Sequence, residues 1–288
     1  MCDRNIFRLS ATVMLAMAVV VVSTSPVFAV DPNGLVAYWP LDGSAVDQGP
    51  NSLDGTPLNG VGFGDGILGN GLHLDGADDY VNVTDAGAFP SIIGGLSQGS
   101  ISVWFKFDRI TTQWEIFPIF YMGDGVGGAG QTSAIIEIGH PQAGDTKLYW
   151  TTYRDDQQNE PTMCFDTNFN LSAGEWYQFT VVVSPSGNTG YLNGQELVDR
   201  DYNFADATSP EFLEDISVQQ VTWIGRGFLA FSPADQYFPG EIDEVVIYDR
   251  PLSATEVLDY YNATVPEPAS ITLLLLGAGG LIRRRRRN

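Results

Sequence analysis

Short runs in which apolar and polar residues alternate follow one another along most of this chain. The clearest runs are 34–41 (GLVAYWPL), 99–107 (GSISVWFKF) and 175–183 (EWYQFTVVV), each bounded by turn residues. A period of two places successive side chains on opposite faces of a strand, and aromatic and β-branched residues favour that state. Further strands are predicted at 72–76, 79–84, 133–139, 146–153, 189–194, 195–200, 221–225 and 242–248. So many short strands with almost no helix predict an all-β sandwich or barrel.

Two local patterns are more specific than the strands. Asn193-Gly194 separates two short strand-like runs, and this pair accepts the positive φ values of a type I′ hairpin turn. The segment 251–262 (PLSATEVLDYYN) reads as a helix that begins with Ser253 and Glu256 as a capping box. Its apolar face would carry Val257 with either Tyr260 or Tyr261.

The first 29 residues have the layout of a secretory signal peptide. Arg4 and Arg8 precede an apolar run over 11–22, and small residues then lead to a cleavage site after Ala29. The alternative is a retained membrane helix, but about 12 apolar residues are too few to cross about 30 Å of hydrocarbon. The pattern therefore predicts export.

The end of the chain has three parts: Pro266-Glu267-Pro268, an apolar run over 269–282, and five arginines. The apolar run reaches only about 21 Å as a helix, and the arginines would hold it on the cytoplasmic side, which predicts a transient stop in the inner membrane. This tail resembles the PEP-CTERM sorting signal of Gram-negative bacteria. The resemblance implies removal by an exosortase and delivery to the cell surface or an extracellular matrix. A retained tail anchor is the alternative.

Charge and cysteine content narrow the possible partners of the part that would be exported. Between 30 and 282, seven basic residues stand against 34 acidic ones, a net charge near −27. Such a chain would repel nucleic acid and anionic lipid, and it suits either high solubility or cation binding. Cys164 is the one thiol left after signal removal, so no intramolecular disulfide is expected. Stability must come from the core, with or without a bound cation.

Six stretches follow in order the pattern of LamG-like jelly-roll domains in the concanavalin A-like lectin/glucanase superfamily. They are LVAYWPLDGSAVDQGPNSLDG, GNGLHLDGADDYVNV, SISVWFKF, GEWYQFTVVV, GYLNGQEL and FPGEIDEVVIYDRPLSATEV. The resemblance covers roughly 34–262, and it departs most over 110–146. It implies an antiparallel β-sandwich of the concanavalin A-like type at 30–264, with one short C-terminal helix. The terminal segments 1–29 and 265–288 would form signal helices.

The superfamily also contains glycoside hydrolases of family 16 type, whose catalytic strand carries Glu-x-Asp-x-x-Glu or a variant one residue longer. Glu241 and Asp243 match the first two positions, but Val246 and Ile247 occupy the two places where the third carboxylate would stand. Glu244 is expected on the opposite face because its spacing from Asp243 is odd. We therefore expect no hydrolase activity.

The resemblance also implies one structural calcium ion between the first strand, an early glycine-rich loop and the last strand. By position, Asp243 would be a ligand, with carbonyl groups near Pro40 and Gly76 and the carboxylate of Asp42 or Asp78. The alternative is that these aspartates only stabilise turns through hydrogen bonds to the backbone.

Sugar binding requires aromatic rings outside the core, because sugar faces stack on them while polar groups bind the hydroxyls. Trp104, Trp176 and Trp223 lie in alternating strands and are assigned to the core. The candidates in or beside loops are Trp114, Tyr121, Trp150, Tyr153, Phe231 and Tyr237.

The sequence thus predicts an exported, non-enzymatic protein that binds a polysaccharide or a matrix component. A structural surface protein without a specific ligand is the main alternative, and a glycoside hydrolase of the same superfamily is a weaker one. Convergence of the loop aromatics on one concave surface would favour binding, and scattered rings would favour the structural role.

Overall fold

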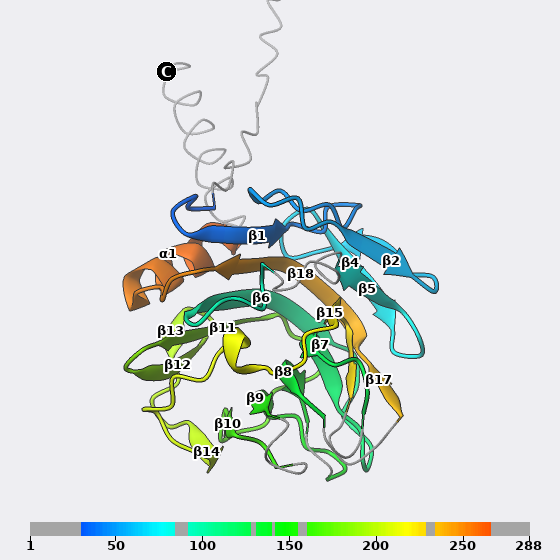
Figure 1. The fold of residues 1–288 in the computed structure, drawn as a ribbon. Helices are drawn as coiled ribbons and strands as arrows, with labels where there is room; N and C mark the ends of the chain where they lie inside the picture. Colours follow the sequence, from blue (N-terminus) through cyan, green and yellow to red (C-terminus); the bar gives the residue numbers. More distant parts are fainter. Residues whose placement is uncertain are drawn as a thin grey trace, which may run out of the picture.

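The computed structural model describes residues 30–83, 92–127, 131–139, 142–154, 160–228 and 234–265. Within them, two eight-stranded antiparallel sheets pack face to face (Figure 1), which confirms the predicted sandwich. Sheet A runs in the order β13 (Gln195–Glu196), β12 (Gly187–Leu192), β11 (Tyr177–Ser184), β6 (Gly99–Phe107), β18 (Pro239–Tyr248), β4 (Asn70–Asp75) and β3 (Gly62–Asp65), with β1 (Leu35–Trp39) paired to β18. Sheet B runs in the order β14 (Asp201–Phe204), β10 (Met163–Asp166), β9 (Leu148–Tyr153), β8 (Ser133–Ile138), β7 (Phe117–Gly123), β15 (Val221–Ile224), β5 (Tyr80–Val83) and β2 (Gly55–Leu58).

Alternating residues of each strand fill the space between the sheets. In β6, Ile101, Val103 and Phe105 belong to the central core, whereas Trp104 lies on the outer face of sheet A. There the Trp104 indole N–H donates to Thr264 Oγ1 at 3.0 Å. Burial is confirmed for Trp104 and Trp223, while Trp176 is only partly buried.

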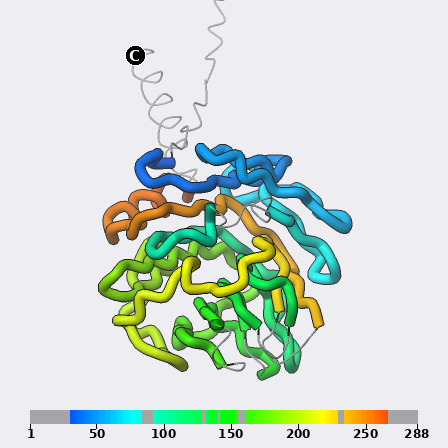
Figure 2. Tube along the Cα trace, in the orientation of Figure 1, coloured from blue at the N-terminus to red at the C-terminus, as the bar shows by residue number. Residues whose placement is uncertain are grey.

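One α-helix, α1 (Ala254–Thr264), covers the outer face of sheet A. Its predicted capping box is present, with Ser253 Oγ accepting from the Glu256 N–H and Glu256 accepting from the Ser253 N–H. Tyr260 is the tyrosine on its buried face. Figure 2 shows α1 and β18 in orange beside the blue β1, so the first and last described elements meet at one end of the sandwich.

The strand pattern missed β7, and its burial explains why. All seven residues of FPIFYMG are buried, because β7 lies inside sheet B with both faces covered, so no polar alternation marks it. The pattern also missed β2, β3, β10 and β14, and only Gln195–Glu196 of the predicted strand 195–200 is paired. A 3-10 turn, η2 (Leu213–Asp215), and a separate hairpin of β16 (Arg226–Phe228) and β17 (Asp235–Tyr237) complete the elements. The predicted turn at Asn193-Gly194 is confirmed by φ values of 49° and 73°.

The predicted terminal signals lie outside the described residues, including the cleavage site at Ala29 and the motif Pro266, Glu267 and Pro268. Within the described part of the chain, no helix combines the length and the apolarity needed to cross a membrane.

Candidate functional site

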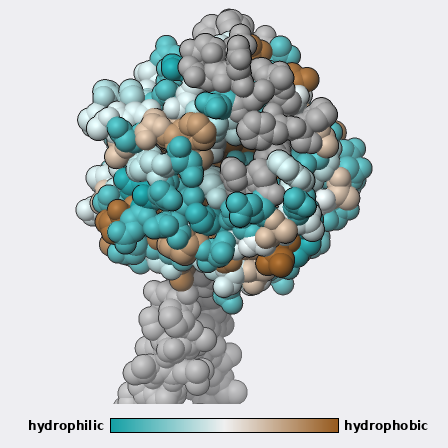
Figure 3. All heavy atoms as spheres, turned by 90° about the horizontal axis from the view of Figure 1, so that it is seen from below, coloured by the Kyte–Doolittle hydropathy of each residue, from teal (hydrophilic) through white to brown (hydrophobic). Residues whose placement is uncertain are grey.

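A polar cleft of about 500 Å³ opens on the outer face of sheet B, where β9, β10 and β14 lie side by side. Figure 3 views the molecule from this side, and the surface there is mostly hydrophilic. The cleft is lined by Gln142, Ala143, Gly144, Asp145, Lys147, Tyr149, Asp166, Asn170 and Asn203. It therefore offers hydrogen-bond donors and acceptors from four separate segments of the chain.

A buried carboxylate organises one wall of the cleft. Asp166 is only 1% exposed, and its Oδ2 accepts from Lys147 Nζ at 3.0 Å and from Asn203 Nδ2 at 3.2 Å. Partial burial opposes the charged ammonium, but the hydrogen bond to Asp166 and the charges of this and two further aspartates together outweigh it, so the pKa of Lys147 is raised. Lys147 is therefore held as a positioned cation at the edge of the cleft.

A second polar group of the cleft lies on β9. The Tyr149 hydroxyl donates to Asp145 Oδ2 at 2.9 Å, and Tyr149 lies opposite Glu137 in the β8–β9 register. Burial, reinforced by the charge of Asp145, raises the pKa of Glu137 to about 8. At neutral pH, Glu137 is therefore mostly a neutral carboxylic acid, which can donate as well as accept a hydrogen bond.

Of the aromatic residues predicted to bind sugar, Trp114 is the one whose ring is clearly exposed. Its side chain is 55% exposed in a loop whose backbone is tied to the rim of the cleft. The Thr111 hydroxyl donates to the carbonyl of Asp145 at 2.7 Å, and the Gly144 N–H donates to the Thr111 carbonyl at 2.9 Å. The Trp114 loop and the cleft rim therefore form one hydrogen-bonded unit.

Two exposed aromatics near the cleft were not predicted. Phe169 is 50% exposed and precedes Asn170 in sequence, and Phe204 is 36% exposed and follows Asn203. Each is a direct sequence neighbour of asparagine, and this was the only available sequence signal. An exposed aromatic side chain contributes little buried apolar surface to folding, and aromatic side chains that gather at the surface mark binding sites.

The prediction that the candidate sugar-binding aromatics lie in or beside loops is wrong for Tyr121 and Trp150. These two residues lie within β7 and β9 and are fully buried. Trp150 packs in the central core. Tyr121 joins Tyr153, which ends β9 and is only 8% exposed, in a second cluster on the outer face of sheet B. All three rings are buried, so they offer no face to a ligand. Phe231 lies outside the described residues.

Tyr237, the last of the six, belongs to a cluster built around one arginine. The Arg226 guanidinium lies 4.1 Å from the Trp223 ring centroid and 5.9 Å from that of Tyr237, and it donates to Asp235 Oδ1 at 2.8 Å. Cation–π contacts of this kind order the rings around the cation. Tyr237 is half-buried there and stabilises the β16–β17 hairpin.

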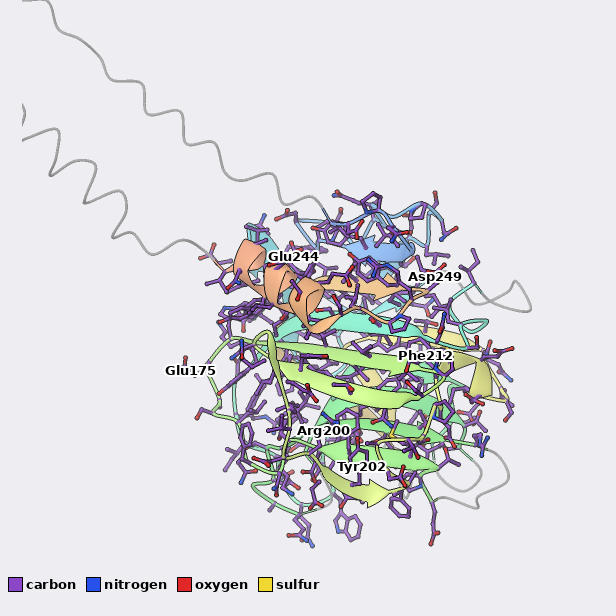
Figure 4. The ribbon with its side chains drawn as sticks, turned by 90° about the vertical axis from the view of Figure 1, so that its left-hand side faces the viewer. Glu175, Arg200, Tyr202, Phe212, Glu244 and Asp249 are labelled. Atoms are coloured by element: carbon purple, nitrogen blue, oxygen red, sulfur yellow. The ribbon has the colours of Figure 1, made fainter. Side chains whose placement is uncertain are left out.

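The acidic residues of β18 lie in sheet A, away from the cleft. Glu241 pairs with Lys106 at 3.3 Å, and Asp243 is fully buried opposite Trp104. Figure 4 places Glu244 beside α1, whereas Tyr202, the neighbour of Asn203, lies on β14 across the sandwich. The carboxylates that resembled a catalytic strand therefore do not face the cleft.

The prediction that Glu244 faces away from Asp243 is wrong, because β18 contains a bulge at this point. The register to β6 shifts between Asp243 and Val246, and Glu244 has a φ of +51°. The extra residue breaks the alternation, so both acids are buried and their charges interact. Glu244 Oε2 accepts from the Tyr38 hydroxyl at 2.8 Å.

The three aspartates named as calcium ligands are not brought together. Asp243 Oδ2 accepts from the Ile67 and Leu68 N–H groups at 2.9 and 3.2 Å, and Asp42 Oδ1 accepts from the Asn70 N–H at 2.7 Å. Both carboxylates thus hold the 66–70 loop through backbone donors. In the described residues, the three carboxylates that lie within 4.8 Å of one another belong to Asp75, Asp78 and Asp79. Of the predicted ligands, only Asp78 is in this group.

Cys164 is a packing residue. It is 4% exposed in β10, and burial raises the pKa of its thiol to about 12. A thiol in that state carries almost no thiolate at neutral pH and is not a nucleophile.

Solved structures share the fold at low sequence identity. Domain 4 of AbnA, a GH43 extracellular arabinanase from Geobacillus stearothermophilus, solved in complex with arabinotriose, matches with a TM-score of 0.54 and 20% identity, over 79% of this chain and 98% of that one. The binding domain of botulinum neurotoxin DC in complex with SialylT matches with a TM-score of 0.56 and 13% identity, over 81% and 52%. The binding domain of Paraclostridial mosquitocidal protein 1 matches with a TM-score of 0.58 and 18% identity, over 80% and 52%. The present chain spans about half the length of the two toxin domains.

Family models match two parts of the sequence, whereas none of the curated proteins matches it. A PEP-CTERM protein-sorting motif covers residues 264–287, which indicates export and sorting to the cell surface. The model of the concanavalin A-like lectin/glucanases superfamily (Laminin_G_3) covers residues 75–258, more than half of the chain. The protein therefore belongs to the concanavalin A-like lectin/glucanases superfamily.

Proposed function

We propose that this protein is a non-enzymatic cell-surface or matrix protein that binds carbohydrate in the cleft on sheet B. The observation that carries the proposal is the polar cleft itself, in which Lys147, Asp145 and Asn203 present charged and amide groups beside the loop of Trp114. Polar groups of this kind bind sugar hydroxyls, and an exposed indole stacks on the sugar ring. The arabinotriose bound to the AbnA domain and the SialylT bound to the neurotoxin domain support a carbohydrate as the ligand class.

The absence of hydrolysis rests on the environment of the β18 carboxylates. Glu241 is paired with Lys106, and the Asp243 carboxylate accepts three backbone N–H groups, including that of Glu244. A retaining glycosidase needs two carboxyl groups about 5–5.5 Å apart across an open sugar site, and a fully buried Asp243 does not meet that need.

The route to the surface is part of the same proposal. A signal peptide cut after Ala29 would start export, the apolar run 269–282 would stop the chain in the inner membrane for a time, and an exosortase would cut near Pro266-Glu267-Pro268. The mature domain would then be released to bind a polysaccharide or another matrix component.

A structural protein without a specific ligand is the second candidate. It is favoured by the burial of Tyr121, Trp150 and Tyr153, which removes half of the predicted binding rings from the surface. The test is a glycan array probed with the full chain, purified in mild detergent because of its apolar ends. The binding proposal predicts a small set of related positive glycans, whereas a blank array would leave the structural role.

Replacing Trp114 by alanine tests the contribution of the exposed ring. We expect about a tenfold weaker affinity for an array-positive glycan, since one aromatic stacking contact is worth about 1–1.5 kcal/mol. The thermal midpoint should hardly change because the side chain is 55% exposed. Val46→Ala, at a 51% exposed apolar position in the loop before β2, is the matched control and should keep the affinity. Equal affinities of both variants and the parent would remove Trp114 from the site.

A further inference from the structure

The connection between β4 and β5 gathers three carboxylates at a point where the chain passes from sheet A to sheet B. Asp75 ends β4, and Asp78 and Asp79 precede β5. Each contributes one carboxylate oxygen to a group whose members all lie within 4.8 Å of one another. Two of the side chains are exposed and Asp79 is buried, so the group is open to solvent on one side.

Asp79 supplies an observation independent of this clustering. Its side chain is 5% exposed, and its Oδ1 is buried without a hydrogen-bond partner among the described residues. The other oxygen, Oδ2, has only a long hydrogen bond of 3.3 Å from the Asp75 N–H. A buried carboxylate oxygen without a donor costs several kcal/mol unless a proton or a cation compensates it. Burial accordingly raises the pKa of Asp79, and the charges of Asp75 and Asp78 add to the effect.

The surroundings hold the oxygens in place without neutralising them. Asn59 Nδ2 donates to the backbone carbonyl of Asp78 at 2.9 Å, which joins the β2–β3 turn to this connection. Gly60 approaches so closely that a Cβ there would lie 3.3 Å from Asp79 Oδ1. Within the described part of the chain, none of the ion pairs involves the three aspartates.

We propose that Asp75, Asp78 and Asp79 bind one Ca²⁺ ion, which links the two sheets at the β4–β5 connection. Ca²⁺ takes six to eight oxygen ligands at about 2.3–2.6 Å, so two ligand oxygens on opposite sides of the ion are up to about 5 Å apart. The oxygens within 4.8 Å meet this limit, and water would complete the shell on the exposed side. The ligand set differs from the one that the sequence suggested, because Asp42 and Asp243 hold the 66–70 loop instead.

The experiment is a calorimetric titration of the EDTA-treated full chain with CaCl₂, together with thermal unfolding with and without the ion. Binding at 100 times Kd should raise the unfolding midpoint by at least about 5 °C. Asp78→Asn should weaken the affinity at least tenfold, since the exposed side chain adds a ligand charge with little role in packing. Asp65→Asn, at an exposed position on neighbouring β3, is the matched control and should bind like the parent.

The Asp79→Asn variant distinguishes a metal ligand from an aspartate with a purely structural role. In EDTA this variant should be at least as stable as the parent, because it removes a buried oxygen without a donor. With Ca²⁺ present, the parent should become the more stable of the two. No heat of binding and no midpoint shift in the parent, or equal responses of parent and Asp78→Asn, would overturn the proposal. Neither outcome depends on glycan binding, so the two proposals fail separately.

Discussion

Replacing Asp47 by alanine is expected to lower the free energy of unfolding by about 3–5 kcal/mol. Asp47 is 7% exposed, and its carboxylate closes the loop that follows β1. Oδ1 accepts from the Tyr38 and Gly49 N–H groups at 2.8 and 2.6 Å, and Oδ2 accepts from the Leu53 N–H at 2.8 Å. Removal of one side chain therefore leaves three backbone donors without their acceptor, each costing about 1–3 kcal/mol where it stays buried.

Denaturant unfolding of the full chain measures this loss. Asp47→Asn keeps one side-chain oxygen as an acceptor and should lose less than the alanine variant. Asp65→Ala, at an exposed position, should stay within about 0.5 kcal/mol of the parent. A loss below about 1 kcal/mol for Asp47→Ala would show that water replaces the carboxylate and that the loop does not depend on it.

The second large effect is a fall in stability as the pH rises from about 4 to about 8. Burial, with the charge of Glu244, raises the pKa of Asp243 to about 8, and burial raises the pKa of Glu244 to about 7. Both values lie above those of an unfolded chain, so over this range the folded state binds more protons than the unfolded state. By linkage, the free energy of unfolding is then largest near pH 4 and declines through the folded pKa values, by a few kcal/mol in total.

Denaturant midpoints measured across this pH range test the effect. Glu244→Gln should flatten the decline because it removes one titrating group and the repulsion felt by Asp243. Glu137 also has a raised pKa of about 8, so the Glu137→Gln variant measures how much Glu137 contributes to the loss of stability with rising pH. A pH profile identical in the parent and in Glu244→Gln would mean that the bulge acids do not titrate in this range.

The β-sandwich could be predicted from the sequence because apolar and polar residues alternate in strands that have one face in the core and one face in contact with polar groups. The prediction fails for β7, where seven buried residues remove the polar half of the pattern. The prediction for Glu244 also fails, because it assumed that side chains alternate between the two faces along the whole strand. The bulge in β18 adds one residue and reverses this alternation. Both failures have a tertiary cause that no local pattern contains.

The candidate site was harder to predict than the fold. Its residues come from the 142–149 segment, the end of β10, the loop after it and β14, and no spacing in the sequence brings these together. Trp114 and Tyr121 both lie in the 110–146 region, where the resemblance is weakest, so the sequence could not separate the exposed ring from the buried one. Trp150 lies in the predicted strand 146–153, and only the packing of the two sheets shows that its ring belongs to the core. The asparagines beside Phe169 and Phe204 carry no motif, and only the sandwich topology places Asn203 beside Asp166.

The affinity of the cleft for an array-positive glycan, measured by isothermal titration calorimetry, tests the proposed function most directly. Asn203→Ala removes an exposed amide of the cleft, and we expect at least a tenfold loss of affinity with the fold retained. Val198→Ala, at a 76% exposed position shortly before β14, is the control and should bind like the parent. An unchanged affinity in Asn203→Ala would contradict the assignment of carbohydrate binding to this cleft.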